Sequence, residues 1–264
     1  MIEIIPAIMP QSFKEMEEKV GSVHRLIKTV HLDVMDGSIT PSVNWPFTEE
    51  GPKEMEKIIK GEIGLPFWKD INYEIDVMMQ EPEASFEDWV NAGFHRIIIH
   101  PETTKRFVHL IKEWSGVVEI GAAVGVDMEN EDAYQYIDAG ADFVQFMGIY
   151  QIGFQGNPFD SRVFEKISKM KKVYPELPVS VDGGVNMSTA LKLFISGADR
   201  LVIGSAIFKK NEGASGFQTF SEFLEGENLD LMNMVSDQHA REEEALNSFK
   251  KLASDYSTEK DQKK

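Results

Sequence analysis

The chain has 264 residues, of which 42% are hydrophobic, and its 27 basic and 44 acidic side chains give a formal net charge of −17. This composition excludes a disordered chain, and no apolar run approaches the roughly 20 residues that span a bilayer. The absence of cysteine excludes disulfides and cysteine catalysis, and the negative charge disfavours nucleic acid and anionic membranes as partners.

The N-terminal MIEIIPAIMP carries an acid where a secretory signal would carry a positive charge, so we expect a cytoplasmic protein. From there, β-rich runs alternate with amphipathic stretches of helix length. The expected strands are residues 2–8, 30–34, 73–79, 96–100, 117–124, 142–147, 179–184 and 200–204. The expected helices include residues 12–26, 82–93, 103–114, 160–173 and 187–198.

Repeated alternation of strand and helix predicts a parallel sheet. A weak internal repeat supports the parallel sheet. In each of three segments, a helix ends with a small residue and glycine and a strand follows: residues 91–100, 138–147 and 195–204. Eight such units predict one (β/α)8 TIM barrel over residues 1–226. A doubly wound open sheet is the main alternative, but no G-x-G-x-x-G follows the first strand.

The C-terminal part, residues 227–264, differs in composition from the rest of the chain. It is polar and helix-prone, and we expect a final helix followed by a disordered polar tail. A solvated appendage is the preferred interpretation over a partner-binding helix.

Polar residues interrupt two strands that would otherwise be apolar. Because side chains alternate across a strand, each of these strands has a polar inward face that also carries methionine: His31, Asp33 and Met35 in one, and Glu74, Asp76 and Met78 in the other. Asp182 ends a later strand. Active sites of TIM barrels lie where the strands end, so these groups could converge on a divalent metal. For any one carboxylate, capping a helix or pairing with Lys or Arg is the simpler interpretation, whereas together they favour a site.

Two glycine-rich turns, at residues 151–159 and 203–208, follow the sixth and eighth strands, and Gly183 with Gly184 follows the seventh. Backbone N–H groups at such turns bind phosphate without a basic patch. Loops after the seventh and eighth strands of TIM barrels commonly do this. A phosphate could therefore bind in an acidic protein.

Several stretches make the chain similar to the ribulose-phosphate 3-epimerase family: IIPAIMP, HLDVMDGSITPS, IDVMMQEPE, HPET, FMGIYQIGFQGNPF, VDGGVN and GADRLVIGSAIF. The resemblance implies a TIM barrel that epimerises a ketopentose phosphate at C3. It implies that Asp33 and Asp182 are the two acid/base residues. It also implies a metal held by His31, Asp33, Asp182 and the position of the family's histidine in the third strand.

The resemblance further assigns residues that surround the substrate. Methionines match those that the family places around the reacting carbons, namely Met35, Met78 and Met147. The glycine-rich turns and the first strand match the positions that contact substrate or phosphate, namely Ala7, Gly153, Gly156, Gly183, Gly184, Gly204 and Ser205.

The chain departs from the family pattern at several positions. The third-strand histidine is replaced by Asp76, or by Met78 if the register shifts by two residues. Ala7 replaces a serine, Ile152 replaces a proline, and residues 44–70 extend the connection after the second strand. With Asp76 as a ligand, the donor set is one nitrogen and three carboxylates, which favours Mn²⁺, Fe²⁺ or Mg²⁺ over Zn²⁺, with Co²⁺ also among the candidates.

The leading hypothesis is a metal-dependent sugar-phosphate 3-epimerase with D-ribulose 5-phosphate as substrate, in a homo-oligomer. A ketohexose 6-phosphate 3-epimerase is a close alternative. A barrel decarboxylase would place a lysine on an inward strand position, and the expected strands hold none. The non-enzymatic alternative is a sugar-phosphate-binding homologue. Under each hypothesis the partner is a small-molecule sugar phosphate, with no nucleic acid and no membrane.

Overall fold

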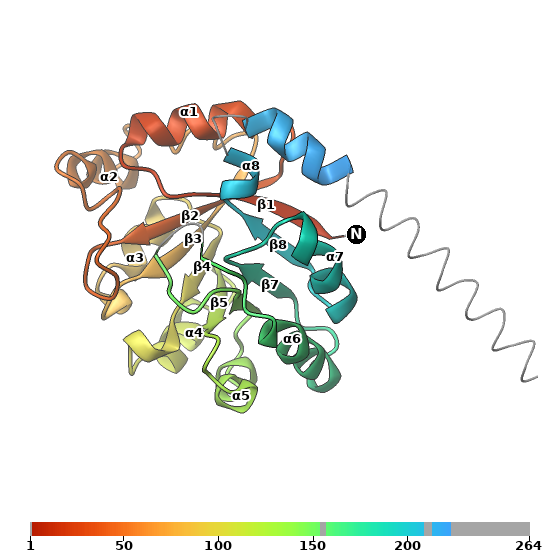
Figure 1. Ribbon diagram of the computed structural model, residues 1–264. Coiled ribbons are helices and arrows are strands. Elements are labelled where there is room, and N and C mark those ends of the chain that lie inside the picture. Colours follow the sequence, from red (N-terminus) through yellow and green to blue (C-terminus); the bar gives the residue numbers. More distant parts are fainter. Residues whose placement is uncertain (1, 154–156, 209–212, 223–264) are drawn as a thin grey trace, which may run out of the picture. The chain divides into compact units, whose positions relative to one another are not determined.

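A computed structural model describes residues 2–153, 157–208 and 213–222 of the chain. Eight parallel strands form a closed barrel in which each strand pairs with its neighbours in the sequence and β1 pairs with β8 (Figure 1). The strands are β1 (Glu3–Ile8), β2 (Thr29–Met35), β3 (Asn72–Met78), β4 (Arg96–Ile99), β5 (Glu119–Val124), β6 (Phe143–Met147), β7 (Val179–Asp182) and β8 (Arg200–Ile203). The predicted TIM barrel is confirmed, and the open-sheet alternative is wrong.

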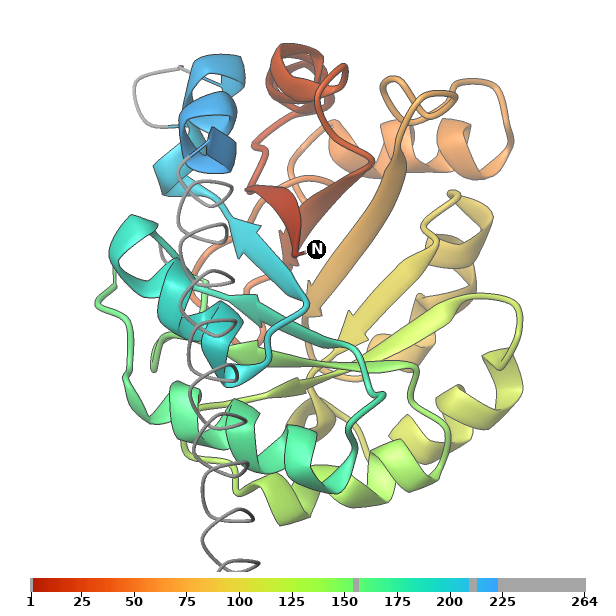
Figure 2. The ribbon, with the colours of Figure 1, turned by 90° about the vertical axis from the view of Figure 1, so that its right-hand side faces the viewer.

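Helices surround the barrel (Figure 2). They are α1 (Phe13–Val23), α2 (Gly51–Ile59), α3 (Phe86–Asn91), α4 (Phe107–Trp114), α5 (Asn130–Asp138), α6 (Arg162–Val173), α7 (Met187–Ser196) and α8 (Ser205–Phe208), with 3₁₀ turns η1 (Pro82–Ala84) and η2 (Pro101–Thr103). Each of the longer helices buries one stripe; α1, for example, buries Met16, Val20 and Val23. Such a stripe appears in the sequence as apolar residues every three to four positions, and this spacing made these helices predictable.

The glycines expected to end helices do so. Gly93, Gly140 and Gly197 follow α3, α5 and α7 and have φ values of 94°, 107° and 107°. These left-handed conformations suit glycine, which has no Cβ. The connection after β2 is more structured than expected, because residues 44–70 contain α2, which begins just before a proline at its second position. Proline is well tolerated in the first turn of a helix.

The strand register places alternate residues of β2 and β3 at matching heights. His31 lies opposite Glu74, Asp33 opposite Asp76, and Met35 opposite Met78. All seven residues of β2 are buried, because one set of side chains fills the barrel interior and the other packs against the helices. The polar residues of the two strands therefore lie inside the barrel, toward the ends at which the strands finish.

The segment after β2 folds back onto its own strand. Asn44 donates from Nδ2 to the Asp33 carbonyl (2.7 Å), and its Oδ1 accepts from the Met35 backbone N–H (2.8 Å). Asp36 accepts from the Ser38 backbone N–H at 2.8 Å, so Asp36 anchors a turn, as its outward parity predicts. These bonds fix the backbone directly after the Asp33 side chain.

No helix among the described residues is long and apolar enough to cross a membrane. The predicted C-terminal helix and tail at residues 227–264 lie outside the described residues, so the boundary at residue 226 stays a prediction. Residues 213–222, just before that boundary, are helical.

Candidate active site

Four side chains from three strands converge inside the barrel. His31 and Asp33 extend from β2, Asp76 from β3, and Asp182 from the end of β7. One donor atom from each lies within 4.8 Å of the donor atoms of the other three. His31 and Asp76 are fully buried, and Asp33 is 8% exposed. Of the two residues that could take the histidine position, Asp76 lies in the cluster and Met78 lines the cavity.

His31 is held between two carboxylates. Its Nδ1 is 2.8 Å from Glu74 Oε1, and its Nε2 is 3.3 Å from Asp33 Oδ1. A carboxylate accepts, so in a neutral ring Nδ1 carries the proton and Nε2 keeps a lone pair that faces the cluster. Glu74 is held in turn by Arg96, whose Nη1 donates to Oε2 at 2.8 Å. Sequence reasoning had put Glu74 on the inward face, among the groups that could converge on a metal, but had not named it as a ligand.

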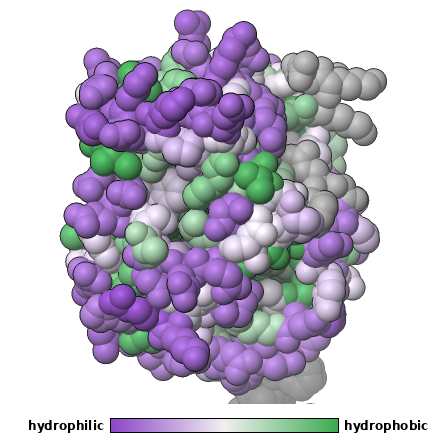
Figure 3. All heavy atoms as spheres, turned by 90° about the vertical axis from the view of Figure 1, so that its left-hand side faces the viewer, coloured by the Kyte–Doolittle hydropathy of each residue, from purple (hydrophilic) through white to green (hydrophobic). Residues whose placement is uncertain are grey.

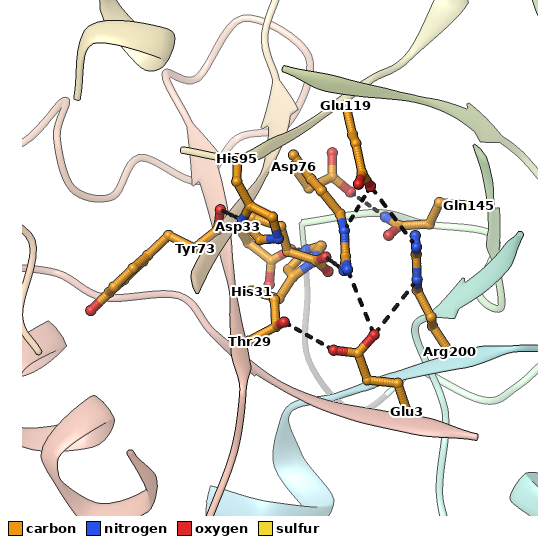
Figure 4. Close-up of polar contacts among 12 residues, drawn as sticks. Glu3, Thr29, His31, Asp33, Tyr73, Asp76, His95, Glu119, Gln145 and Arg200 are labelled. Carbon is orange, nitrogen blue, oxygen red and sulfur yellow. Dashed lines mark hydrogen bonds and ion pairs between the residues drawn. The ribbon is translucent and has the colours of Figure 1, made fainter. Parts of the chain in front are cut away.

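Both oxygens of Asp76 accept hydrogen bonds. His100, just after β4, places its Nε2 2.9 Å from Oδ1. Gln145 of β6 donates from Nε2 to Oδ2 at 2.8 Å (Figure 4). All three residues are at most 1% exposed. Sequence reasoning missed both partners. The only signal was positional, because His100 ends a strand and Gln145 shares its inward parity with Met147.

The buried carboxylates have shifted pKa values. Burial raises the pKa of Asp182 to about 8, and repulsion from Asp33 adds to the shift. Burial also raises the pKa of Asp33, although His31 opposes that effect. Several anionic groups share a confined volume, so they resist simultaneous ionisation.

The pKa values of two buried histidines are raised, whereas burial alone would lower them. Burial lowers the pKa of His31 and of His100, but their carboxylate partners outweigh it. The pKa of His31 rises well above its usual range because of Asp33 and Glu74. That of His100 rises to about 10 because of Asp76. A cation among the carboxylates would displace protons from such a cluster.

The donor set fits a divalent metal. His31 Nε2 and Asp33 Oδ1 are buried and face each other at 3.3 Å, but neither makes a hydrogen bond within the described structure. Unpartnered buried polar atoms are costly and call for an explanation. One imidazole nitrogen and three carboxylates form a chemically reasonable set of ligands for Mn²⁺, Fe²⁺, Mg²⁺ or Co²⁺, and Zn²⁺ also accepts such ligands.

A cavity opens above this cluster, with an empty volume of about 590 Å³ that includes its open mouth. Asp33 and Asp182 both line it. Most of the substrate-contacting residues expected from sequence line it as well, namely Ala7, Met78, Met147, Gly153, Gly183, Gly184, Gly204 and Ser205. Met35 is buried and does not line the cavity, and Gly156 lies outside the described residues.

The cavity combines an apolar wall with a glycine-rich rim. Met9, Ile149, Ile152, Val185 and Val202 supply further apolar lining, and Asn157 adds an amide. Figure 3 shows apolar and weakly polar side chains in the middle of one face, inside a mostly hydrophilic rim. Gly183 and Gly184 have φ values of 91° and 68°, a backbone conformation that turns the chain sharply after Asp182.

A second polar cluster lies toward the other end of the barrel. Arg96 and Arg200 contact Glu3 and Glu119 from β1 and β5, at distances of 3.0 to 3.9 Å (Figure 4). Glu74 joins Arg96 to His31, so a continuous chain of charged contacts runs from this cluster to the candidate metal ligands.

Comparison with known proteins places the chain among sugar-phosphate barrels. The profile of the ribulose-phosphate 3 epimerase family matches residues 3–208. The chain is 28% identical over 232 residues to the chloroplastic ribulose-5-phosphate-3-epimerase of Arabidopsis thaliana, covering 85% of this chain and 75% of that one. It is 27% identical over 220 residues to ribulose-phosphate 3-epimerase of Bacillus subtilis, covering 80% and 94%.

The fold is also similar to that of solved structures. That of 3-hexulose-6-phosphate synthase superposes with a TM-score of 0.63 at 17% identity, covering 84% of this chain and 99% of the other. At this identity the likeness concerns the barrel architecture alone.

Proposed function

The chain belongs to the ribulose-phosphate 3-epimerase family, and from this premise we propose that it is a metal-dependent isomerase that inverts C3 of D-ribulose 5-phosphate to give D-xylulose 5-phosphate. The observation that carries the proposal is that Asp33 and Asp182, from β2 and β7, both line one cavity and lie in the same donor cluster. A fold alone does not specify the reaction, and it is this pair of carboxylates that supports proton transfer by two bases.

Epimerisation beside a carbonyl requires two proton transfers on opposite faces of one carbon. One carboxylate removes the C3 proton, which leaves a planar enediolate, and the other, initially protonated, delivers a proton to the opposite face. In the reverse direction the two groups exchange these roles. Asp33 and Asp182 extend from strands with β8 and β1 between them, so they reach a substrate from two walls of the cavity.

The remaining side chains serve binding and exclusion of water. Met78, Met147 and Val202 line the cavity with groups that offer no exchangeable proton to the planar intermediate. No Lys or Arg lines the cavity within the part of the chain that the structure describes. We assign the phosphate to backbone N–H groups around Gly183, Gly184, Gly204 and Ser205, at the turns after β7 and β8.

The residues that would hold the cation are His31, Asp33, Asp76 and Asp182. When bound, such an ion supplies positive charge close to the oxygens on which negative charge develops during enolisation. Glu74 keeps the Nε2 lone pair of His31 directed into the cluster, by accepting a hydrogen bond from Nδ1.

The experiment is an assay of the purified protein with D-ribulose 5-phosphate, before and after treatment with EDTA and after addition of single divalent metals. We expect conversion to D-xylulose 5-phosphate that EDTA abolishes and one or more metals restore. Asp33→Asn and Asp182→Asn should each lower kcat by about 10²- to 10⁴-fold, whereas Asp127→Asn, an exposed carboxylate in the loop before α5, should leave kcat unchanged.

Proton exchange in D₂O gives a sharper test of the two-carboxylate mechanism. In either single variant, the remaining carboxylate should still exchange the C3 proton of one epimer, and only that one, without inversion. The two variants should differ in which epimer exchanges. Exchange of both epimers in one variant would show that a single base serves both faces and would refute the mechanism.

A ketohexose 6-phosphate is the alternative substrate, because residues 44–70 lengthen the connection after β2. A higher kcat/KM for that ketose in the same assay would favour it. A metal-loaded protein that binds sugar phosphates and exchanges no proton would be a non-catalytic homologue.

A further inference from the structure

Gln145 is an unusual residue for its position. It lies at the centre of β6, between Val144 and Phe146, and is 0% exposed. Its Nε2 donates to Asp76 Oδ2 at 2.8 Å, while its Oε1 is buried without a hydrogen-bond partner in the described structure. An apolar side chain would fill a barrel interior without leaving such a group unsatisfied. The amide therefore calls for an explanation other than packing.

The partner of Gln145 identifies what the amide does. An ionised carboxylate can only accept, so the NH₂ group of Gln145 must face Asp76. His100 Nε2 lies 2.9 Å from the other oxygen of the same carboxylate. Donors from β4 and β6 thus act on both oxygens of one side chain on β3, and together they fix its rotation about χ2. Each oxygen retains a second lone pair that can face the donor cluster.

Because His100 binds Asp76, it is not a member of the donor cluster. Its Nε2 is directed at Asp76, and it is not among the side chains whose donor atoms lie within 4.8 Å of one another. The cluster consequently has one nitrogen donor, from His31, and three carboxylates. Oxygen-rich sets of this kind favour harder divalent ions.

We propose that Gln145 and His100 are positioning residues that hold Asp76 in the orientation of a metal ligand, and that Gln145 in this way sets the preference of the site for Mn²⁺ over Zn²⁺. This inference rests on the metal site of the proposed function. It assigns a role to two residues of this chain that touch neither substrate nor metal. Groups that orient metal ligands typically change metal affinity 10- to 100-fold when they are removed.

The experiment compares metal affinities of the full-length protein with those of variants. Gln145→Met removes the amide and keeps most of the side-chain length. His100→Asn shortens the side chain, so that its amide lies near the Nδ1 position and no donor remains at the position of Nε2. Mn²⁺ binding is measured by the electron paramagnetic resonance signal of the free ion, and Zn²⁺ binding by competition against bound Mn²⁺. Gln135→Met, an exposed glutamine on α5, is the matched control.

We expect Gln145→Met to raise the Mn²⁺ dissociation constant by about 10- to 100-fold. We also expect it to lower the ratio of Zn²⁺ to Mn²⁺ dissociation constants, because a carboxylate free to rotate no longer favours the harder ion. His100→Asn should weaken Mn²⁺ binding in the same direction, and Gln135→Met should match the parent. A loss of overall stability would not by itself change the ratio, so the ratio separates positioning from a structural role.

The outcomes distinguish failure of this inference from failure of the metal site. If the parent binds Mn²⁺ and both variants bind it equally well, the positioning role is wrong and the metal site stands. If the parent binds neither ion, the metal dependence of the proposed function fails, and this inference fails with it. If Gln145→Met does not fold, the Mn²⁺ affinity of His100→Asn alone tests the positioning role. A Mn²⁺-loaded crystal structure with Gln145 Oε1 on the ion would also overturn the assignment, because Gln145 would then be a ligand.

Discussion

At the scale of single residues, Asp76 occupies the position at which the family resemblance predicts a histidine. A histidine there would bring a neutral nitrogen donor, whereas the aspartate brings a third carboxylate to the cluster. The surrounding side chains match the aspartate, because His100 and Gln145 both present N–H groups to it. A carboxylate accepts two such bonds readily, and an imidazole cannot.

Asp76→His should therefore shift the metal preference toward Zn²⁺ at a cost in stability. The added nitrogen donor favours the softer ion, while the donor groups of His100 and Gln145 lose their shared acceptor. Leaving buried donors unsatisfied costs about 1–3 kcal/mol for each group. The measurements are metal content by elemental analysis and the free energy of unfolding in urea.

Glu176→His, at an exposed site far from the cluster, is the control for an added imidazole. Stoichiometric Zn²⁺ in the parent, purified without chelator, would contradict the argument, since the aspartate would then not disfavour that ion.

The residues of the candidate cluster were predictable because each sits in a strand with clear alternation. Parity alone put His31, Asp33 and Asp76 on inward faces, and the break at Gly183 put Asp182 at a strand end. Gln145 and His100 could not be paired with Asp76 in this way. The contact of Gln145 with Asp76 crosses the barrel interior between residues 69 apart in the chain, and its distance depends on how the closed barrel brings the walls together. The contact of His100 with Asp76 joins the neighbouring strands β3 and β4, and it depends on their register.

At the scale of elements, the site depends on how closely the turns after β6 and β7 approach. A Cβ on Gly148 would lie 2.1 Å from the carbonyl oxygen of Gly183. The contacting atom belongs to the backbone, so it cannot rotate away. The two turns can meet beside Asp182 only because residue 148 has no side chain.

Gly148→Ala should displace the turn at Gly183 and Gly184, and with it the proposed phosphate contacts. We expect KM for the sugar phosphate to rise by about tenfold or more, since one misplaced turn weakens several backbone contacts. Steady-state kinetics give the KM. Gly125→Ala is the matched control, because a Cβ there meets nothing within 4 Å. An unchanged KM in Gly148→Ala would show that the phosphate does not depend on this turn.

Most elements of the fold were predictable because the strand, helix and glycine pattern repeats along the chain. The exception is α2, which lies within residues 44–70 and was interpreted as an extended connection. The Gly-Pro pair at the start of this helix, at Gly51, is typical of a turn. The helix is recognisable mainly from the burial of Met55 and Ile58. Tertiary packing therefore decided a segment whose local signals were ambiguous.

At the scale of the whole molecule, the net charge of −17 disfavours the binding of an anionic substrate. Arg96, which is buried, and Arg200, which is partly buried, are paired with acidic groups toward the other end of the barrel and do not line the cavity. The homo-oligomer, the cytoplasmic location and the role of residues 227–264 stay predictions.

The charge predicts how catalysis responds to salt. A sugar phosphate approaching this protein meets a repulsive field, and salt screens that field because the Debye length falls from about 30 Å at 0.01 M to about 8 Å at 0.15 M ionic strength. Backbone N–H dipoles at the phosphate site act only at short range, so screening affects them little. We therefore expect kcat/KM for D-ribulose 5-phosphate to rise between 10 mM and 150 mM salt, mainly through KM. Steady-state rates at saturating metal measure it.

Comparison of NaCl with potassium acetate at equal ionic strength controls for specific effects of chloride. If the increase comes from screening, both salts produce it equally, and kcat changes little because chemistry inside the cavity is shielded from bulk ions. A steady fall in kcat/KM with both salts would contradict the argument. It would mean that a local positive field at the mouth attracts the substrate more strongly than the net charge of the protein repels it.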